Sequence, residues 1–173
     1  MDQLLKYEFE KIFPGCRLLD IHEYLMEKDV GLQESSSVQY IYHDPCHTPM
    51  KTYQPLAVAS SLLGQAVQLS DRCCGEAGTL AVSRPDIATQ LRFRKQEELQ
   101  NGIQKLKTNE SNSEIKLLTS CPACQQGLSR YTDDTGLKAD YIVVELARGL
   151  LGDNWQQKFI SDIKQGGIEK VLL

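Results

Sequence analysis

The sequence predicts an α/β fold with a mainly parallel sheet flanked by helices. Short apolar runs rich in β-branched and aromatic residues alternate with longer stretches of helical character along the 173-residue chain, as in folds whose strands are joined by helices. Apolar residues make up 41% of the chain and charged residues 24%, the balance of a globular protein. This length suits one domain, residues 1–173.

The first half of the chain is expected to contain a helical lead-in, two strands and a helix. Pro14-Gly15 interrupts the apolar pattern of the lead-in, and Ile21, Tyr24 and Leu25 resume it at helical spacing. Strand character comes from V-Q-Y-I-Y, and Gly64 is a suitable helix end. The expected elements are a lead-in at 1–30, a strand at 38–42, a helix at 54–63 and a strand at 66–69.

The second half is expected to contain the longest helix and two more sheet elements. Ile87, Leu91 and Leu99 belong to a broken apolar stripe, and a polar loop follows at 108–114. I-K-L-L-T then has the composition of a buried strand. The expected elements are a helix at 85–106, a strand at 115–119, a fourth apolar run at 141–144 leading into a helix to 151, and a helix at 155–164.

Five of the six cysteines follow the ends of the first three expected strands. In open parallel sheets, ligands bind outside the carboxyl ends of the strands, so these cysteines are expected to meet at one edge. Neighbouring side chains on a strand point to opposite faces, and Gly75 permits the sharp bend that would let the adjacent pair before it reach one object. The five are Cys46, Cys73, Cys74, Cys121 and Cys124.

The C-P-A-C motif is expected to begin a helix. Ser120 or Cys121 suits the N-cap, and Pro122 suits the first helical position because its missing N–H is not needed there. Cys124 then lies about one turn into the helix, on the side of Cys121. Free N–H groups and the positive end of the helix dipole favour thiolates at this point. Residues 76–78 are expected to start another helix with the same effect.

The first residues do not resemble an export signal, so a reducing compartment is expected, and in that setting a set of thiols favours metal or redox chemistry over structural disulfides. Thiolate ligands select zinc or iron–sulfur centres, and tetrahedral zinc needs only four. Five cysteines suit a multinuclear iron–sulfur centre better. Zinc, a thioredoxin-type dithiol and plain buried thiols remain open. His43 and His47 flank Cys46 and are expected either to donate hydrogen bonds to the ligands, to supply a spare ligand, or to be turn residues that make local hydrogen bonds. Gly75 is expected beside the ligands, whereas Cys16 falls outside the set.

With these motifs, the sequence resembles the cysteine-rich CCG domain family. That module recurs in heterodisulfide reductase B subunits and in the iron–sulfur parts of FAD-linked glycolate and D-lactate dehydrogenases. The matching pieces are H-D-P-C-H (43–47), C-C-G-E-A-G (73–78), S-C-P-A-C (120–124) and the ending G-G-I-E-K-V-L-L. The first interval between cysteine groups is shorter than is usual in the family and the second is longer.

The resemblance implies that the five cysteines ligate an iron–sulfur centre, a 4Fe–4S cluster that is noncubane in some relatives, while others hold zinc. It implies an electron-transfer domain, not catalytic alone, of an FAD-linked 2-hydroxyacid (D-lactate- or glycolate-type) oxidoreductase. Zinc-stabilised interaction and thiol–disulfide chemistry are the alternatives. FAD and ferredoxin-type domains are expected elsewhere, with a quinone or cytochrome as acceptor and this chain as a C-terminal fragment.

Charge and hydropathy limit the kinds of partner and the location expected for this chain. The net charge of −4 gives no general attraction to nucleic acid. No apolar run approaches the roughly 18 residues that span a bilayer, so a cytoplasmic protein is expected, with peripheral attachment at the inner face of the membrane as a variant. Arg92, Arg94 and Lys95 are expected on a solvated helix face, because two glutamates follow directly. No side chain is singled out for acid–base catalysis.

Overall fold

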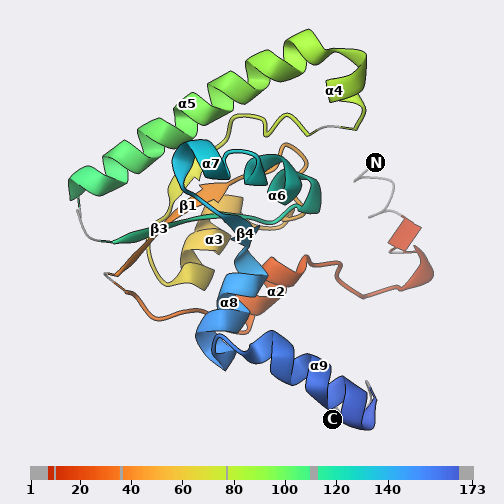
Figure 1. The fold of residues 1–173 in the computed structure, drawn as a ribbon. Coiled ribbons are helices and arrows are strands. Elements are labelled where there is room, and N and C mark those ends of the chain that lie inside the picture. The colour runs from red at the N-terminus through yellow and green to blue at the C-terminus, as the bar shows by residue number, and fades with distance from the viewer. Residues whose placement is uncertain (1–7, 10, 36, 77, 110–112, 168–173) are drawn as a thin grey trace.

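A four-stranded parallel sheet with the order β2-β1-β3-β4 organises the chain (Figure 1). The computed structural model describes residues 8–9, 11–35, 37–76, 78–109 and 113–167. Every strand pair within these residues is parallel, and helices flank the sheet, so the predicted α/β fold is confirmed. The strands are β1 (Val38–His43), β2 (Gln68–Ser70), β3 (Glu114–Thr119) and β4 (Ala139–Tyr141).

The register brings the carboxyl ends of the first three strands level with one another. His43, the last residue of β1, pairs with Ser70 at the end of β2 and with Thr119 at the end of β3. Thr119 reinforces this register, since its hydroxyl donates to the His43 carbonyl at 3.1 Å. The three loops that carry the five cysteines therefore leave the sheet from the same edge.

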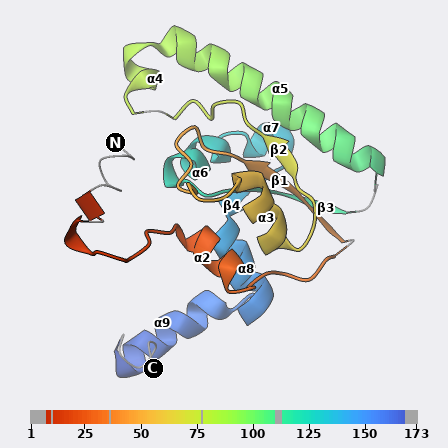
Figure 2. The ribbon, with the colours of Figure 1, turned by 180° about the vertical axis from the view of Figure 1, so that it is seen from behind.

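Helices cover both faces of the sheet, as the two opposite views show (Figures 1 and 2). Helices α2, α3 and α8 lie on one face, and α5, α6 and α7 lie on the other. In both views α9 extends away from the sheet. The helices are α2 (Ile21–Glu27), α3 (Pro55–Leu63), α4 (Leu80–Ser83), α5 (Pro85–Asn109), α6 (Pro122–Ser129), α7 (Thr132–Thr135), α8 (Ile142–Leu151) and α9 (Trp155–Gly166).

Alternating side chains of the strands divide the core into two apolar clusters. Tyr40 and Tyr42 of β1 pack with α3 and α8, whereas Ile41 between them packs with α5 and α6. Leu118 and Leu117 of β3 divide in the same way. A sheet buried on both faces needs apolar residues at successive positions, which is why these strands read as continuous apolar runs.

Most expected elements lie within a few residues of their predicted places. α3, α5, β1 and β3 match, and Gly64 ends α3 with a φ of +70°. Of the helical lead-in, residues 1–7 and 10 lie outside the described residues, while α2 is present and begins with a capping box of Asp20 and Glu23. The second strand begins two residues later than expected.

Two predictions need correction. The apolar run 141–144 is mainly the first turn of α8, and the fourth strand is the preceding Ala139–Tyr141. An apolar run of this length does not distinguish a buried strand from a buried helical turn. The helix expected to start at 76–78 begins at Leu80 instead, with Ala77 outside the described residues. The one-turn helix α7 has no periodic pattern and was not predicted.

Within the part of the chain that the structure describes, none of the helices combines the length and apolar character needed to cross a bilayer.

Candidate metal centre

Two sulfur atoms from distant parts of the chain touch at the carboxyl edge of the sheet. The Sγ atoms of Cys74, after β2, and Cys124, in α6, lie 3.3 Å apart. Both residues are 4% exposed and belong to the apolar cluster beneath α5. The convergence predicted from the strand ends is therefore present for these two groups.

The C-C-G turn has the bend that its glycine was expected to allow. Gly75 has a φ of +78°, a conformation that side chains other than glycine rarely adopt. Its backbone N–H donates to Cys73 Sγ at 3.3 Å. The turn thereby places two successive thiols at the same edge of the sheet, with Cys74 buried and Cys73 half-buried.

A second glycine lets α6 approach this turn closely. A Cβ atom on Gly127 would lie 2.9 Å from Glu76 Cβ and 3.4 Å from the Cys74 carbonyl oxygen. The first of these distances is shorter than real Cβ atoms allow, and the second is at the lower limit of ordinary van der Waals contact. The absence of a side chain at Gly127 is therefore what allows the helix bearing Cys124 to lie against the loop bearing Cys74.

The C-P-A-C motif begins α6 as predicted. Cys121 is the N-cap, Pro122 is the first helical residue, and the Gln125 N–H donates to the Cys121 carbonyl at 2.9 Å. Cys124 follows one turn later. The unpaired N–H groups of a first helical turn favour negative charge nearby.

The thiols perturb one another's protonation. The hydrogen bond from the Cys124 thiol lowers the pKa of Cys74, against the effect of burial, and His43 lowers it further. The same hydrogen bond raises the pKa of Cys124, together with burial and the charges of Cys74 and Cys121. The contact thus favours ionisation of Cys74 over ionisation of Cys124, whereas a bound metal ion would require both as thiolates.

Cys46 lies on the neighbouring loop and is exposed. Partial burial raises its pKa, and so do the charges of Cys73 and Cys74, so the three thiols share one electrostatic environment. His47 is exposed.

The loop that carries Cys46 is held by Glu23, which sequence reasoning did not single out. The Glu23 side chain is buried, with the residue 1% exposed, and its Oε1 accepts from the N–H groups of Thr52 and Tyr53 at 2.6 and 2.9 Å. Its Oε2 accepts from the Asp20 N–H at 3.3 Å. Glutamate at the third position of a helix is the only sequence signal, and it points to capping alone.

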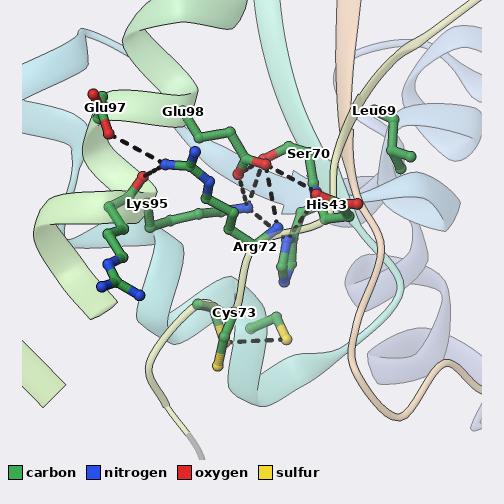
Figure 3. A network of polar contacts seen from close by, with 12 residues as sticks. His43, Leu69, Ser70, Arg72, Cys73, Lys95, Glu97 and Glu98 are labelled. Carbon is green, nitrogen blue, oxygen red and sulfur yellow. Dashed lines mark hydrogen bonds and ion pairs between the residues drawn. The ribbon is translucent and has the colours of Figure 1, made fainter. Parts of the chain in front are cut away.

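His43, which flanks Cys46 in the sequence, lies close to the contacting sulfur pair. A ligand atom of the His43 ring and the sulfurs of Cys74 and Cys124 all lie within 4.8 Å of one another. The residue is 1% exposed, and its Nε2 has no hydrogen-bond partner among the described residues. Figure 3 shows the ring between the Lys95 side chain and the sulfur atoms.

Lys95 corrects the prediction that the basic cluster is solvated. Arg94 is exposed as expected, but Lys95 has no exposed surface. Its Nζ donates to Ser70 Oγ at 2.5 Å, to Glu98 Oε2 at 2.7 Å and to His43 Nδ1 at 3.0 Å. The prediction failed because α5 passes over the ends of β1 and β2 and turns this one position of the cluster inward, where tertiary partners compensate for burial of its charge.

The arrangement suits a soft metal. Two contacting buried thiols and a buried imidazole lie together at this edge, and the loops that carry Cys46, Cys73 and Cys121 leave the sheet from the same edge. Sulfur ligands select zinc or iron–sulfur centres over hard cations. Fold and site together define an α/β domain with a thiolate site at the carboxyl edge of its parallel sheet.

The comparisons with known proteins agree with this class. Residues 40–129 match the model of the cysteine-rich domain, CCG, and residues 129–173 match a domain of unknown function, DUF3400. The chain belongs to the CCG cysteine-rich domain family, and the resemblance stated from its motifs is confirmed.

Two curated relatives come from methanogens. One is an uncharacterized iron-sulfur protein of Methanococcus maripaludis, 26% identical over 140 residues that cover 75% of this chain and 26% of the relative. The other is the B subunit of the fumarate reductase (CoM/CoB) of Methanothermobacter marburgensis, 26% identical over 140 residues that cover 77% of this chain and 27% of the relative. The chain thus spans about a quarter of their length. No solved structure gives a significant match.

Proposed function

We propose that this chain is an iron–sulfur-binding electron-transfer domain. Its ligands would be Cys46, Cys73, Cys74, Cys121 and Cys124, around a 4Fe–4S centre. The observation that carries the proposal is the 3.3 Å contact between Cys74 and Cys124 at the edge where the other cysteine groups also leave the sheet. Membership of the CCG family and two relatives, one named as an iron-sulfur protein, add support.

The number of thiols favours iron and sulfide over zinc. A structural zinc site takes four ligands, whereas five cysteines and an adjacent histidine surround this edge of the sheet. When bound, an iron–sulfur centre supplies reversible one-electron redox chemistry. The zinc-stabilised interaction domain remains the alternative that this count disfavours.

The site has a base that is buried among apolar residues and a rim, formed by Cys46 and Cys73, that solvent can reach. Leu128 and Tyr131 are buried in the apolar cluster that contains Cys74 and Cys124, and such surroundings exclude water from the sulfurs. Cys46, by contrast, is exposed and Cys73 is half-buried. Electron exchange with a partner would therefore take place over the rim formed by these two residues.

The proposal extends to the larger enzyme that would contain this domain. We infer a larger FAD-linked oxidoreductase of 2-hydroxyacids, of the D-lactate or glycolate type, in which this domain is a C-terminal part. Flavin and ferredoxin-type domains or subunits would supply electrons, and a quinone or cytochrome would receive them, in the cytoplasm or at the inner face of the membrane. The motifs that resemble those enzymes support this context, and so do relatives about four times as long as the matched region.

Direct thiol–disulfide chemistry is a second candidate, supported by one observation. The Cys74 and Cys124 sulfurs lie 3.3 Å apart, and their hydrogen bond lowers the pKa of Cys74, which favours its nucleophilic thiolate form. Attack by Cys74 on a substrate disulfide, followed by displacement by Cys124, would form a Cys74–Cys124 disulfide and release the substrate as two thiols. Turnover of a disulfide by the chain would have to depend on both cysteines for this candidate to hold.

Anaerobic purification followed by elemental analysis tests the main proposal. Iron and acid-labile sulfide in near-equal amounts, with broad visible absorbance that bleaches on reduction, are the expected result. Zinc alone, without colour, would overturn the proposal in favour of the interaction domain. A chain that neither retains nor accepts any metal after anaerobic reconstitution would overturn both.

A further inference from the structure

The buried Lys95 ammonium has three hydrogen-bond acceptors for its three protons. Ser70 Oγ, Glu98 Oε2 and His43 Nδ1 lie 2.5, 2.7 and 3.0 Å from Nζ. Because an ammonium donates only, each of these three atoms must act as an acceptor toward Lys95. With no exposed surface, the amine has no water to replace them.

Glu98 keeps Lys95 charged in this position. The Glu98 carboxylate accepts from Ser70 Oγ at 2.7 Å and from the N–H groups of Asp71 and Arg72 at 3.2 Å each, so it is held in its ionised form. Burial is the largest influence on the pKa of Lys95 and lowers it overall, while the hydrogen bond and the charge of Glu98 oppose that effect. A buried amine beside a carboxylate that receives this many donors is retained as the ammonium.

The charged lysine decides which nitrogen of His43 carries the proton. His43 Nδ1 has two neighbours at 3.0 Å, the donor Lys95 Nζ and the acceptor Ser70 O. The Ser70 carbonyl already accepts from the Asp44 N–H at 3.3 Å, whereas no other acceptor is described for the third proton of Lys95. Nδ1 therefore accepts from Lys95, and in the neutral ring the proton resides on Nε2.

This tautomer directs an N–H group at the sulfur atoms. Nε2 is buried without a described partner, and the ring lies within 4.8 Å of the sulfurs of Cys74 and Cys124. In Figure 3 the far edge of the His43 ring points toward the sulfurs. A buried N–H without an acceptor is costly, and a thiolate is the acceptor that this site offers.

We propose that His43 is not a ligand but an N–H donor to the cysteine sulfurs that hold the metal centre, and that Lys95 is the positioning residue that fixes its tautomer. The proposal rests on the iron–sulfur function proposed above. Hydrogen bonds to cluster sulfurs and buried positive charge favour the reduced, more negative state and raise the reduction potential.

Substitutions at both positions test the proposal in the reconstituted chain. His43→Gln keeps an amide N–H near the position of Nε2, whereas His43→Asn keeps nitrogen only near Nδ1. Lys95→Met removes the ammonium but keeps the chain length, and Lys116→Met is the control, because Lys116 instead pairs with Glu145 at 2.7 Å.

We expect His43→Gln and the control to keep the wild-type midpoint potential. His43→Asn and Lys95→Met should each lower it by about a tenfold shift in the redox equilibrium, or about 59 mV for one electron, the size expected from losing one hydrogen bond to a charged acceptor. Iron content should stay at the wild-type level in all four. Loss of iron from both His43 variants would show that His43 is a ligand and would overturn the proposal, as would an unchanged potential in Lys95→Met.

A second readout needs no iron. In the reduced, metal-free wild-type chain, ¹⁵N NMR of the His43 ring should show the proton on Nε2, and Lys95→Met should move it to Nδ1, where Ser70 O can accept it. A proton on Nδ1 in the wild type would overturn the proposal. If the chain takes up no iron, the proposed function fails while this measurement still decides the tautomer.

Discussion

Replacing Gly127 with alanine should disturb the metal centre while leaving the rest of the fold in place. The new Cβ would lie 2.9 Å from Glu76 Cβ, 3.4 Å from the Cys74 carbonyl and 3.6 Å from Cys74 Cβ. The first of these distances forces either the C-C-G turn or α6 to move. Since Cys74 and Cys124 lie on these two elements, the movement would separate the sulfurs that now touch at 3.3 Å.

The expected stability change follows from two opposing contributions. Alanine in place of glycine inside a helix stabilises by about 1 kcal/mol, whereas overpacking a tight contact costs about 1–3 kcal/mol. Gly127→Ala should therefore change the unfolding free energy by between about 0 and 2 kcal/mol in the destabilising direction. The larger effect should be on metal, because changes that disorient ligands typically weaken metal sites by about 10–100-fold.

Gly102→Ala is the matched control, since Gly102 is also a helical glycine packed on the sheet. Its Cβ would meet only flexible side-chain ends, Ile41 Cδ1 at 3.4 Å and Gln68 Cγ at 3.8 Å. It should stabilise the metal-free chain by up to about 1 kcal/mol and retain wild-type iron. Urea denaturation of the metal-free chains and iron per chain after reconstitution measure both effects. If Gly127→Ala stabilises as much as Gly102→Ala and retains wild-type iron, the close approach of α6 does not form the site.

Three further tests, which use four substitutions, address other parts of the site and fold. Cys124→Ser should remove most of the metal and Cys16→Ser, at an exposed thiol, should not; equal elemental analyses would contradict the ligand set. Glu23→Gln should lower the unfolding free energy of the metal-free chain by about 1–3 kcal/mol, since charged acceptors make the stronger hydrogen bonds. An unchanged urea midpoint of unfolding would show that the loop bearing Cys46 is held by other contacts. Burial raises the pKa of Glu98, but hydrogen bonds from Lys95 and a serine hydroxyl outweigh it and lower the pKa. Its contribution is present above the unfolded-state pKa and is lost as the pH falls through the folded value, so Glu98→Gln should flatten the acid side of the stability profile; an unchanged slope would contradict the pairing.

The edge of the sheet from which the cysteine-bearing loops leave was predictable from the order of strands and cysteines in the sequence. V-Q-Y-I-Y, the run before Ser70 and I-K-L-L-T each end shortly before a cysteine group, and parallel strands bring such ends together. The bend at Gly75 and the helix start at Pro122 were predictable from the conformational limits of glycine and proline. Both rules depend only on a residue and its neighbours in the sequence, and both hold in the structure.

The features that the sequence did not predict depend on contacts between residues that are distant in the chain. In R-F-R-K-Q-E-E the lysine reads as one charge on a solvated face, and only the passage of α5 over Ser70 and His43 buries it. Glu23 reads as a helix cap, yet it also holds the loop around Thr52. The same limit explains β4, where Ile142 fits either a strand or the helix that it begins.

Diffraction at the iron absorption edge from crystals of the anaerobically reconstituted chain would test the central claim most directly. The account predicts an anomalous peak at the carboxyl edge of the sheet, within bonding distance of cysteine sulfurs, with Cys46, Cys73, Cys74, Cys121 and Cys124 as the ligands. His43 should lie beside the peak with its Nε2 nearest sulfur. Iron bound away from this edge, or iron held without either Cys74 or Cys124, would contradict it.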